Sequence, residues 1–353
     1  MSKYDFLDLS DKEYHGDKSA VGSSTLKSML DNPIKGYKEH TGEIEVKETE
    51  ALILGSLIHT LVLEPHEFDN RYIVADDFKM PSEDTLIKVE GREVAMYPKE
   101  VLTSTGKLST AKAKLPIIEE LDKDEEIAYL TPNEYASYIL YKENMDKKFI
   151  TQEMLDFAND VATKARDYTF HITADGTTHS FTFSFLEKEG LVQYEKAFYF
   201  WIDKDTLEVS PEPKEGFIKA KIKPDMLVKV APNTYVVYDL KTAQTAGKDE
   251  IALNGAKRYW HLQEALYTLG LEAHGLNVFK FRFLIVGKNE WSTAQEYEYD
   301  IPTKDLGKEH LSKALKLFDK AQKGELKETV FDPATNEYDL EPTVTAPSWL
   351  FYL

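Results

Sequence analysis

Two short β-prone runs joined by a tight turn constrain the fold of this chain more than any other stretch. Residues 217–230 are rich in apolar side chains that alternate in part with lysines, and residues 235–240 form a second apolar run. Between them, Ala231-Pro232-Asn233-Thr234 is typical of a turn. The pattern predicts two antiparallel strands. A loop over 231–233 would set Asp225 directly opposite Asp239, with Cβ atoms about 5 Å apart.

The charged residues of this predicted hairpin suit a metal site. Two carboxylates at close range repel each other unless a proton or a cation intervenes. Their oxygens are the ligands that Mg²⁺ prefers, and a metal so held polarises a phosphoryl oxygen and lowers the pKa of a bound water. Period-2 alternation places Lys241 on the same face as Asp239, where it can orient that water or stabilise charge on a phosphate. The hairpin therefore predicts metal-dependent phosphodiester cleavage.

The alternative is a surface hairpin whose charges are solvated, which is the usual meaning of an isolated Asp-x-Lys. Two features favour the functional interpretation. The Lys223-Pro224-Asp225 segment lies at the matching distance on the paired strand, and the charges of Asp239 and Lys241 follow the apolar run 235–238. Functional sites are commonly built where buried strands end.

Composition narrows the class of protein. A chain of 353 residues can bury a large core, and the absence of cysteine excludes disulfides, iron–sulfur clusters and thiolate zinc sites. The first residues lack the apolar region of a signal peptide, and no apolar run reaches transmembrane length. We therefore expect a soluble, cytoplasmic protein without membrane partners.

The net charge of −19 argues against a protein that coats polyanions generally. The charge is unevenly distributed, because residues 214–263 contain nine Lys/Arg and five Asp/Glu. Two of those acids are Asp225 and Asp239, which a metal would neutralise. This distribution predicts a locally basic site on an acidic protein, which suits a nuclease better than a coating protein.

The order of predicted elements indicates an α/β (α+β) fold with a mixed central β-sheet flanked by helices. Residues 76–185 include a charged and weakly patterned stretch, for which we expect an inserted subdomain between a first segment, 1–75, and a core, 186–353. The predicted helices cover 24–30, 50–63, 131–144, 151–168, 251–271 and 306–323. The predicted strands cover 71–75, 177–186, 192–202, 217–230, 235–240, 278–286 and 296–301.

Two predicted helices carry polar residues four positions apart, which share one face. Gly55 and His59 form such a pair in the first helix, and Gln263 and Tyr267 form another in the second. Taken alone, His59 is typical of a core histidine, and Gln263 and Tyr267 are ordinary helix residues. Glu195 beside Lys196 is by itself typical of a solvated cross-strand pair.

These motifs together resemble the PD-(D/E)XK nuclease superfamily, and among its members the RecE-type (exonuclease VIII) phage recombination exonucleases, relatives of the RecB nuclease domain. The resemblance covers most of residues 10–300 and is weakest over 76–185. Its order and spacing are more specific than any one motif. It rests on Tyr14-His15, Ser24-Thr-Leu-Lys27, Leu54-Gly-Ser-Leu-Ile-His59, Phe68-Asp-Asn-Arg-Tyr-Ile-Val74, Lys223-Pro-Asp225, Asp239-Leu-Lys241 and Tyr259-Trp-His-Leu-Gln263-Glu-Ala-Leu-Tyr267.

The resemblance implies a role for each matching residue. One departure is that the third core acid is Asp239, where many members of the superfamily have Glu. The implied roles are metal ligation by Asp225, Asp239 and the main-chain carbonyl of Leu240, the catalytic lysine for Lys241, a place at the metal or scissile phosphate for His59, an upstream acid for Glu195, and support of the site and the DNA strand for Gln263 and Tyr267, with Arg258 grouped with them in DNA binding.

The resemblance also implies an activity and partners. It indicates a Mg²⁺-dependent exonuclease, with Mn²⁺ as a possible substitute, that degrades linear double-stranded DNA from 5′ to 3′ and leaves a 3′ single strand. It further implies a ring-shaped homo-oligomer, a RecT-like single-strand annealing protein as partner, and a phage or prophage function in homologous recombination inside a bacterial host. Two alternatives remain: another endonuclease or end-processing nuclease of the same fold, and a non-catalytic DNA-binding module.

Overall fold

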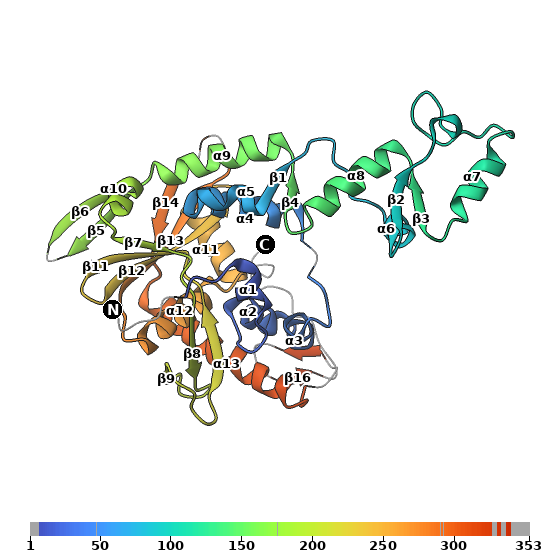
Figure 1. The fold of residues 1–353 in the computed structure, drawn as a ribbon. Helices are drawn as coiled ribbons and strands as arrows, with labels where there is room; N and C mark the ends of the chain where they lie inside the picture. The colour runs from blue at the N-terminus through green and yellow to red at the C-terminus, as the bar shows by residue number, and fades with distance from the viewer. Residues whose placement is uncertain are drawn as a thin grey trace, which may run out of the picture. The chain divides into compact units, whose positions relative to one another are not determined.

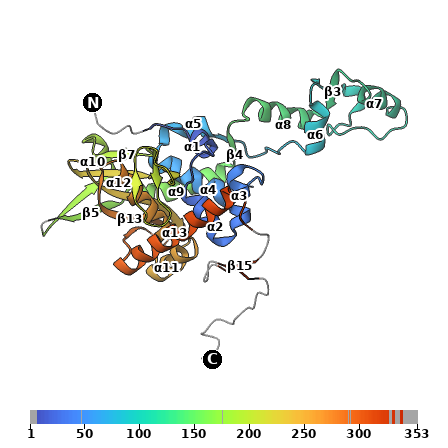
Figure 2. The same cartoon turned by 90° about the horizontal axis from the view of Figure 1, so that it is seen from below.

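The computed structural model describes residues 7–46, 48–174, 176–289, 291 and 293–326, and the backbone of two short strands beyond them. The chain divides into two compact units (Figures 1 and 2). The first unit contains Met1–Glu64 and Asp160–Leu353, and the second contains Pro65–Asn159. The second unit therefore begins at Pro65, before the predicted start at 76. It ends at Asn159, because residues 160–185 of the predicted insertion belong to the first unit.

The first unit holds most of the regular structure. Its helices are α1 Asp11–Gly16, α2 Ser23–Asp31, α3 Pro33–Thr41, α4 Glu50–Leu63, α10 Phe183–Lys188, α11 Lys248–Lys257, α12 Trp260–Ala273 and α13 Ile301–Gln322. Its strands are β5 Thr169–Ala174, β6 Thr177–Thr182, β7 Val192–Tyr194, β8 Phe198–Ile202, β9 Val209–Ser210, β10 Ile218–Ile222, β11 Met226–Ala231, β12 Thr234–Ala243, β13 Asn277–Gly287, β14 Ala294–Tyr297, β15 Val330–Asp332 and β16 Glu337–Asp339. Helix α9, Gln152–Arg166, begins in the second unit and ends in the first.

A mixed five-stranded sheet organises the first unit. The strand order is β14-β13-β12-β11-β7. β12 and β13 are parallel, joined by a crossover through α11 and α12, whereas the other pairs are antiparallel. A separate three-stranded antiparallel sheet has the order β10-β8-β9. The predicted α/β class with a mixed central sheet is thus confirmed (Figure 1).

Two predicted long strands are each broken, and the break moves the chain from one sheet to the other. The segment 192–202 forms β7 in the five-stranded sheet and β8 in the three-stranded sheet, with Glu195 at a left-handed φ of 51° between them. The segment 217–230 forms β10 and β11 in the same two sheets, separated at Lys223-Pro224-Asp225. Proline has no amide hydrogen for a strand ladder, which explains a break there.

The register of β11 and β12 agrees with the predicted pairing of Asp225 with Asp239, although the turn differs from the expected one. Met226 lies opposite Tyr238, and one further step of this register sets Asp225 opposite Asp239. Strand β12 begins at Thr234, so the connection is shorter than the predicted 231–233 loop. A register shift between Lys229 and Ala231 supplies the missing residue, because Val230 is left unpaired as a bulge.

Helix α12 packs against both sheets. Its buried side chains share one hydrophobic core with β8, β10, β12 and β13, and with α2 and α13. A Cβ atom added at Gly270 would lie 2.6 Å from Ile222 Cδ1 and 2.7 Å from Phe200 Cε1, so glycine permits this close approach. Figure 2 shows α13 running beside α2 and α3, which it also contacts.

Three further predicted boundaries differ from the structure. The predicted helix 251–271 is two helices, because Tyr259 has a left-handed φ of 51° between α11 and α12. The predicted strand 177–186 ends at Thr182, whose side chain caps the short helix α10. The predicted strand 296–301 also stops early, because Asp300 caps α13 through the amide of Thr303. In the last two cases a capping side chain begins a helix that the apolar pattern concealed.

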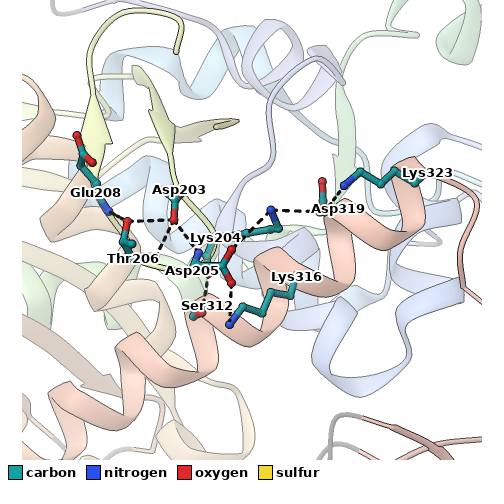
Figure 3. A network of polar contacts seen from close by, with 9 residues as sticks. All are labelled: Asp203, Lys204, Asp205, Thr206, Glu208, Ser312, Lys316, Asp319 and Lys323. Atoms are coloured by element: carbon teal, nitrogen blue, oxygen red, sulfur yellow. Dashed lines mark hydrogen bonds and ion pairs between the residues drawn. The ribbon is translucent and has the colours of Figure 1, made fainter. Parts of the chain in front are cut away.

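Polar contacts fix the β8–β9 turn to α13 (Figure 3). Ser312 Oγ donates to the carbonyl of Lys204 at 2.6 Å, and Lys316 Nζ lies 3.2 Å from Asp205 Oδ1. Within the turn, the carboxylate of Asp203 accepts from the amide of Thr206 at 2.7 Å. A surface hollow of about 550 Å³ lies here, lined by both acids and lysines. Lys316 and Asp205 in this lining pair with each other and join the turn to α13, so we assign the region a structural role.

The second unit contains short helices and two small parallel sheets. Its elements are the 3₁₀ turns η1 Pro65–Glu67 and η2 Lys99–Val101, α5 Phe68–Arg71, α6 Glu83–Val89, α7 Leu115–Asp122, α8 Pro132–Glu143, β1 Tyr72–Val74, β2 Glu93–Met96, β3 Ile127–Leu130 and β4 Lys148–Ile150. β1 pairs with β4, and β2 pairs with β3. Two small apolar clusters, around Leu130 and around Val101, form its core. Among the described residues of either unit, no helix is long and apolar enough to span a membrane.

Candidate active site

The carboxylates of Asp225 and Asp239 lie where the hairpin enters the core. Tyr235, Val237 and Ala243 of β12 belong to the core cluster that contains α12, so alternation points Asp239 into the same layer. Asp239 is fully buried, and Asp225 is 8% exposed. Asp225 Oδ2 accepts a hydrogen bond from the amide of Leu240 at 2.7 Å. Two acids thus replace apolar side chains at the centre of the unit.

Burial and the neighbouring charge of Asp239 raise the pKa of Asp225 well above its ordinary value. A carboxylate held this way gains a great deal from a nearby cation, because the cation restores the charged form. The pair is therefore poised to take up positive charge rather than to form a neutral structural contact.

Lys241 supplies one such charge. Its ammonium forms an ion pair with Asp239 Oδ2, and its Nζ lies 3.4 Å from the carbonyl of Leu240. Burial alone would lower the pKa of Lys241, but Asp239 and Asp225 outweigh it and raise the pKa. Lys241 is consequently a stable cation at neutral pH and can donate hydrogen bonds to an anionic group.

His59, on α4, faces the same carboxylates. Its Nδ1 lies 3.7 Å from Asp225 Oδ2, and the ring also forms a hydrogen bond with the backbone of Leu240. Burial, followed by the charge of Lys241, lowers the pKa of His59 to about 4. The imidazole is therefore neutral at neutral pH, which is the form that ligates metals. The histidine face predicted from the Gly55/His59 spacing is the one turned toward the hairpin acids.

Glu195 joins this group through the break between β7 and β8. Its amide donates to the carbonyl of Asp225 at 3.2 Å, which ties the two chain crossings together. Burial raises the pKa of Glu195 to about 7, although the nearby Lys223 acts in the opposite direction. Lys223 Nζ lies 3.2 Å from Glu195 Oε2 and 2.6 Å from Asp11 Oδ1. Glu195 is thus a half-buried member of the site and not a solvated partner of Lys196.

Three of these side chains can offer ligand atoms to one ion. Among the described residues, one atom each from His59, Glu195 and Asp225 lie within 4.8 Å of one another. Asp239 stands beside this trio, engaged by Lys241. The set contains carboxylate oxygens and one neutral imidazole, which suits a hard divalent cation such as Mg²⁺ or Mn²⁺. The donor chemistry therefore fits a metal without identifying it.

Gln263 and Tyr267 face the site from α12. Gln263 Nε2 donates to Asp239 Oδ1 at 2.5 Å, so the predicted helix residue touches a hairpin acid directly. Tyr267 is buried beside it and forms a hydrogen bond with Ser23 at the start of α2. Arg258, assigned with them to DNA binding, is exposed at the end of α11. Its charge is close enough to lower the pKa of Lys27.

Three residues at the site, Lys27, Lys223 and Asp11, have no role that their sequence pattern predicts. Lys27 lies 2.5 Å from Gln263 Oε1, and Lys223 bridges Glu195 and Asp11. Strand alternation places Lys223 on the same face as Asp225, two positions later, and this could have identified Lys223. The chain changes sheets between the two residues, which weakens the alternation argument. Nothing in the sequence signals Asp11, which belongs to a one-turn helix at the start of the chain.

Comparisons with known proteins leave the function to be argued from this site. No family model matches the chain, and no curated protein matches it. Among solved structures, the chain is similar to a protein from Eubacterium rectale that is named a "putative exonuclease". The two share 13% identity and a TM-score of 0.44, over 96% of this chain and 97% of the other. A likeness at this level carries no argument about activity.

Proposed function

We propose that this protein is a metal-dependent deoxyribonuclease of the PD-(D/E)XK type. The observation that carries the proposal is the convergence of Asp225, Asp239, Lys241 and His59 at one buried point of β12. A structural ion pair would need one acid and one base, whereas here two buried carboxylates, Asp225 and Asp239, lie side by side next to a neutral histidine. Adjacent buried carboxylates are expected where a protein binds a cation.

The site residues divide the chemistry of phosphodiester hydrolysis between them. A divalent cation, when bound, supplies Lewis acidity at the phosphate and makes water more acidic. His59, Glu195 and Asp225 offer the converging ligand atoms that would hold it, and the resemblance adds Asp239 and the carbonyl of Leu240 as further ligands. A water oxygen attacks phosphorus, and the bond from phosphorus to the leaving sugar oxygen breaks. The Lys241 ammonium donates a hydrogen bond to the phosphate and stabilises the charge that develops there.

The charge pattern supports DNA as the polyanion. A chain of net charge −19 repels nucleic acid over most of its surface, so binding must be local. Lys241 and Lys27 lie at the site, and Arg258 lies near Lys27. Such a local group of positive charges suits an enzyme that binds one short stretch of DNA backbone.

The finer properties are part of the proposal and follow from the resemblance alone. We propose a RecE-type exonuclease that acts with Mg²⁺ on linear duplex ends from 5′ to 3′. It would work as a ring-shaped homo-oligomer with a RecT-like single-strand annealing partner. A phage or prophage recombination system in the cytoplasm of a bacterial host would be its setting.

One assay tests activity, polarity and the role of the lysine together. Linear duplex DNA, labelled separately at each 5′ and 3′ end, is incubated with Mg²⁺ and either the wild type or the Lys241→Ala variant. We expect rapid release of the 5′ label by the wild type and a rate about 10²–10³-fold lower for the variant, the usual effect of removing one charge-stabilising donor.

Closed circular DNA provides the control for exonuclease action. An exonuclease spares the circle, whereas cleavage of the circle would replace the exonuclease with an endonuclease. If wild-type protein with Mg²⁺ or Mn²⁺ degrades neither substrate, the enzyme proposal fails and a non-catalytic DNA-binding module takes its place.

A further inference from the structure

Three polar side chains form a relay from α2 to the candidate metal site. Lys27 Nζ donates to Gln263 Oε1 at 2.5 Å, and Gln263 Nε2 donates to Asp239 Oδ1 at 2.5 Å. The other oxygen of Asp239 pairs with Lys241. Lys27 thus stands one residue removed from a carboxylate that is itself fully buried.

The chemistry of these groups permits one orientation of the Gln263 amide. An ammonium can only donate hydrogen bonds, and a carboxylate can only accept them. In its protonated form Lys27 therefore requires the amide oxygen on its side, and Asp239 requires the amide nitrogen on the other. If the amide turned over, its oxygen would face a carboxylate and its NH₂ group would face a cation, so both contacts would be repulsive.

Burying a lysine for one bond to a neutral amide is unfavourable by itself. Burial, followed by the charge of Lys241, lowers the pKa of Lys27 to about 7, and Asp239 and Asp225 only partly oppose this. A partly buried cation costs free energy unless neighbouring groups stabilise its charge. The hydrogen bond to Gln263 and the negative charges of Asp239 and Asp225 stabilise the Lys27 ammonium at this position.

We propose that Lys27 is a positioning residue for Asp239. Its ammonium fixes the Gln263 amide, and the amide then holds Asp239 in the orientation that receives the cation. The proposal rests on the proposed function, since it assumes that Asp239 is a metal ligand. It assigns Lys27 no contact with the substrate.

A double-mutant cycle tests this relay with Mn²⁺ binding as its main readout. The variants are Lys27→Met, Gln263→Ala and the double variant, each titrated with Mn²⁺ by calorimetry at one pH. Second-layer partners of metal ligands are commonly worth about 10–100-fold in metal affinity. We expect each single variant to weaken Mn²⁺ binding about 10-fold and the double variant to be no weaker than Gln263→Ala alone.

Two further variants separate positioning from general damage. Lys219 likewise donates a hydrogen bond to a neutral partner, Ser19 Oγ, at 2.8 Å, so Lys219→Met is the matched control and should leave Mn²⁺ affinity unchanged. Lys27→Arg keeps a donor-only cation and should restore much of the affinity that Lys27→Met loses. Should Lys27→Met not fold, Lys27→Gln replaces it, because that side chain keeps a donor but no longer dictates one orientation.

The outcomes are distinct. If the two single losses multiply in the double variant, Lys27 affects the metal independently of Gln263, and the relay is overturned. Unchanged Mn²⁺ affinity in Lys27→Met overturns it as well. If the cycle behaves as expected while the wild type cuts no DNA, the relay stands and the nuclease proposal alone fails.

Discussion

The candidate site has a regular side and an irregular side. On the regular side, β12 runs through the site without interruption and presents Asp239 and Lys241 by simple alternation. On the irregular side, the chain crosses between the two sheets at Glu195 and again just before Asp225. Both sides deliver buried charges to one point. The difference shows that a strand ladder can place a pair of charges, while a third acid needs a break in the ladder.

Energetically, the two sides also differ. The regular side costs little backbone strain, because no residue of β12 has a positive φ. The irregular side holds Glu195 at a φ of 51°, a conformation that non-glycine residues rarely adopt. Such strain persists where the surroundings hold it firmly, and Lys223 and the Asp225 carbonyl both hold Glu195 here.

The largest effect should come from the regular side. Asp239→Asn removes the buried charge opposite Asp225 and should lower the cleavage rate by a factor on the order of 10³ or more, the scale for losing one member of a catalytic unit. Glu195→Gln should lower it by about 10–100-fold. Rates on end-labelled linear duplex measure both variants. Equal losses would abolish the proposed ranking of the two sides.

The next effect concerns stability on the irregular side. Lys223→Met leaves Glu195 and Asp11 without their shared cation, and breaking a buried ion pair typically costs about 3–5 kcal/mol. Urea unfolding in EDTA measures the loss. Lys280→Met is the control, because its pair with Glu298 is partly exposed and should contribute about 0–1 kcal/mol. Similar losses for both variants would show that the Lys223 bridge is not special.

A pH dependence should follow from Glu195. Its pKa is raised to about 7 in the folded protein from an ordinary 4.5, so the native state binds more protons than the unfolded state between these values. Stability should therefore fall as pH rises through this window. In Glu195→Gln, unfolding in EDTA at pH 5 and pH 8 should show this fall reduced by about 1–3 kcal/mol. If the fall in unfolding free energy between pH 5 and pH 8 is unchanged in Glu195→Gln, Asp225 and not Glu195 is the group whose titration causes it.

The smallest effect should come from Pro224. Pro224→Ala frees the unfolded chain without removing a contact at the site, so it should lower stability by about 0.4–1 kcal/mol. The cleavage rate should stay within about twofold. A large loss of activity would mean that the crossing depends on proline itself and not on the surrounding packing.

The regular side could be predicted from the sequence, and the irregular side could not. Alternation and the turn signal placed Asp239, Asp225 and Lys241 in the correct register, even though a bulge at Val230 replaced a longer loop. Apolar runs continue through Glu195 and through Lys223-Pro224-Asp225, so the pattern showed two long strands where the chain changes sheets. The pattern of a strand records which face is buried, but not against which sheet.

The α12 side of the site was predicted in part. Spacing placed Gln263 and Tyr267 on one face, and that face does point to Asp239 and α2. The break at Tyr259 was missed, because a left-handed residue other than glycine leaves no signature in an apolar pattern. Lys27 was missed for another reason: its partner is distant in sequence, and only tertiary structure brings them together.

The bond between Lys27 and Gln263 joins residues 236 positions apart. A chain emerging from the ribosome exposes α2 and α4 long before α12 has been synthesised. Asp239 therefore has no Gln263 partner until translation has passed residue 263. A protein assembled in this order lacks the complete proposed site during most of its synthesis, and a proteolytic fragment without α2 would lack the Lys27 end of the relay.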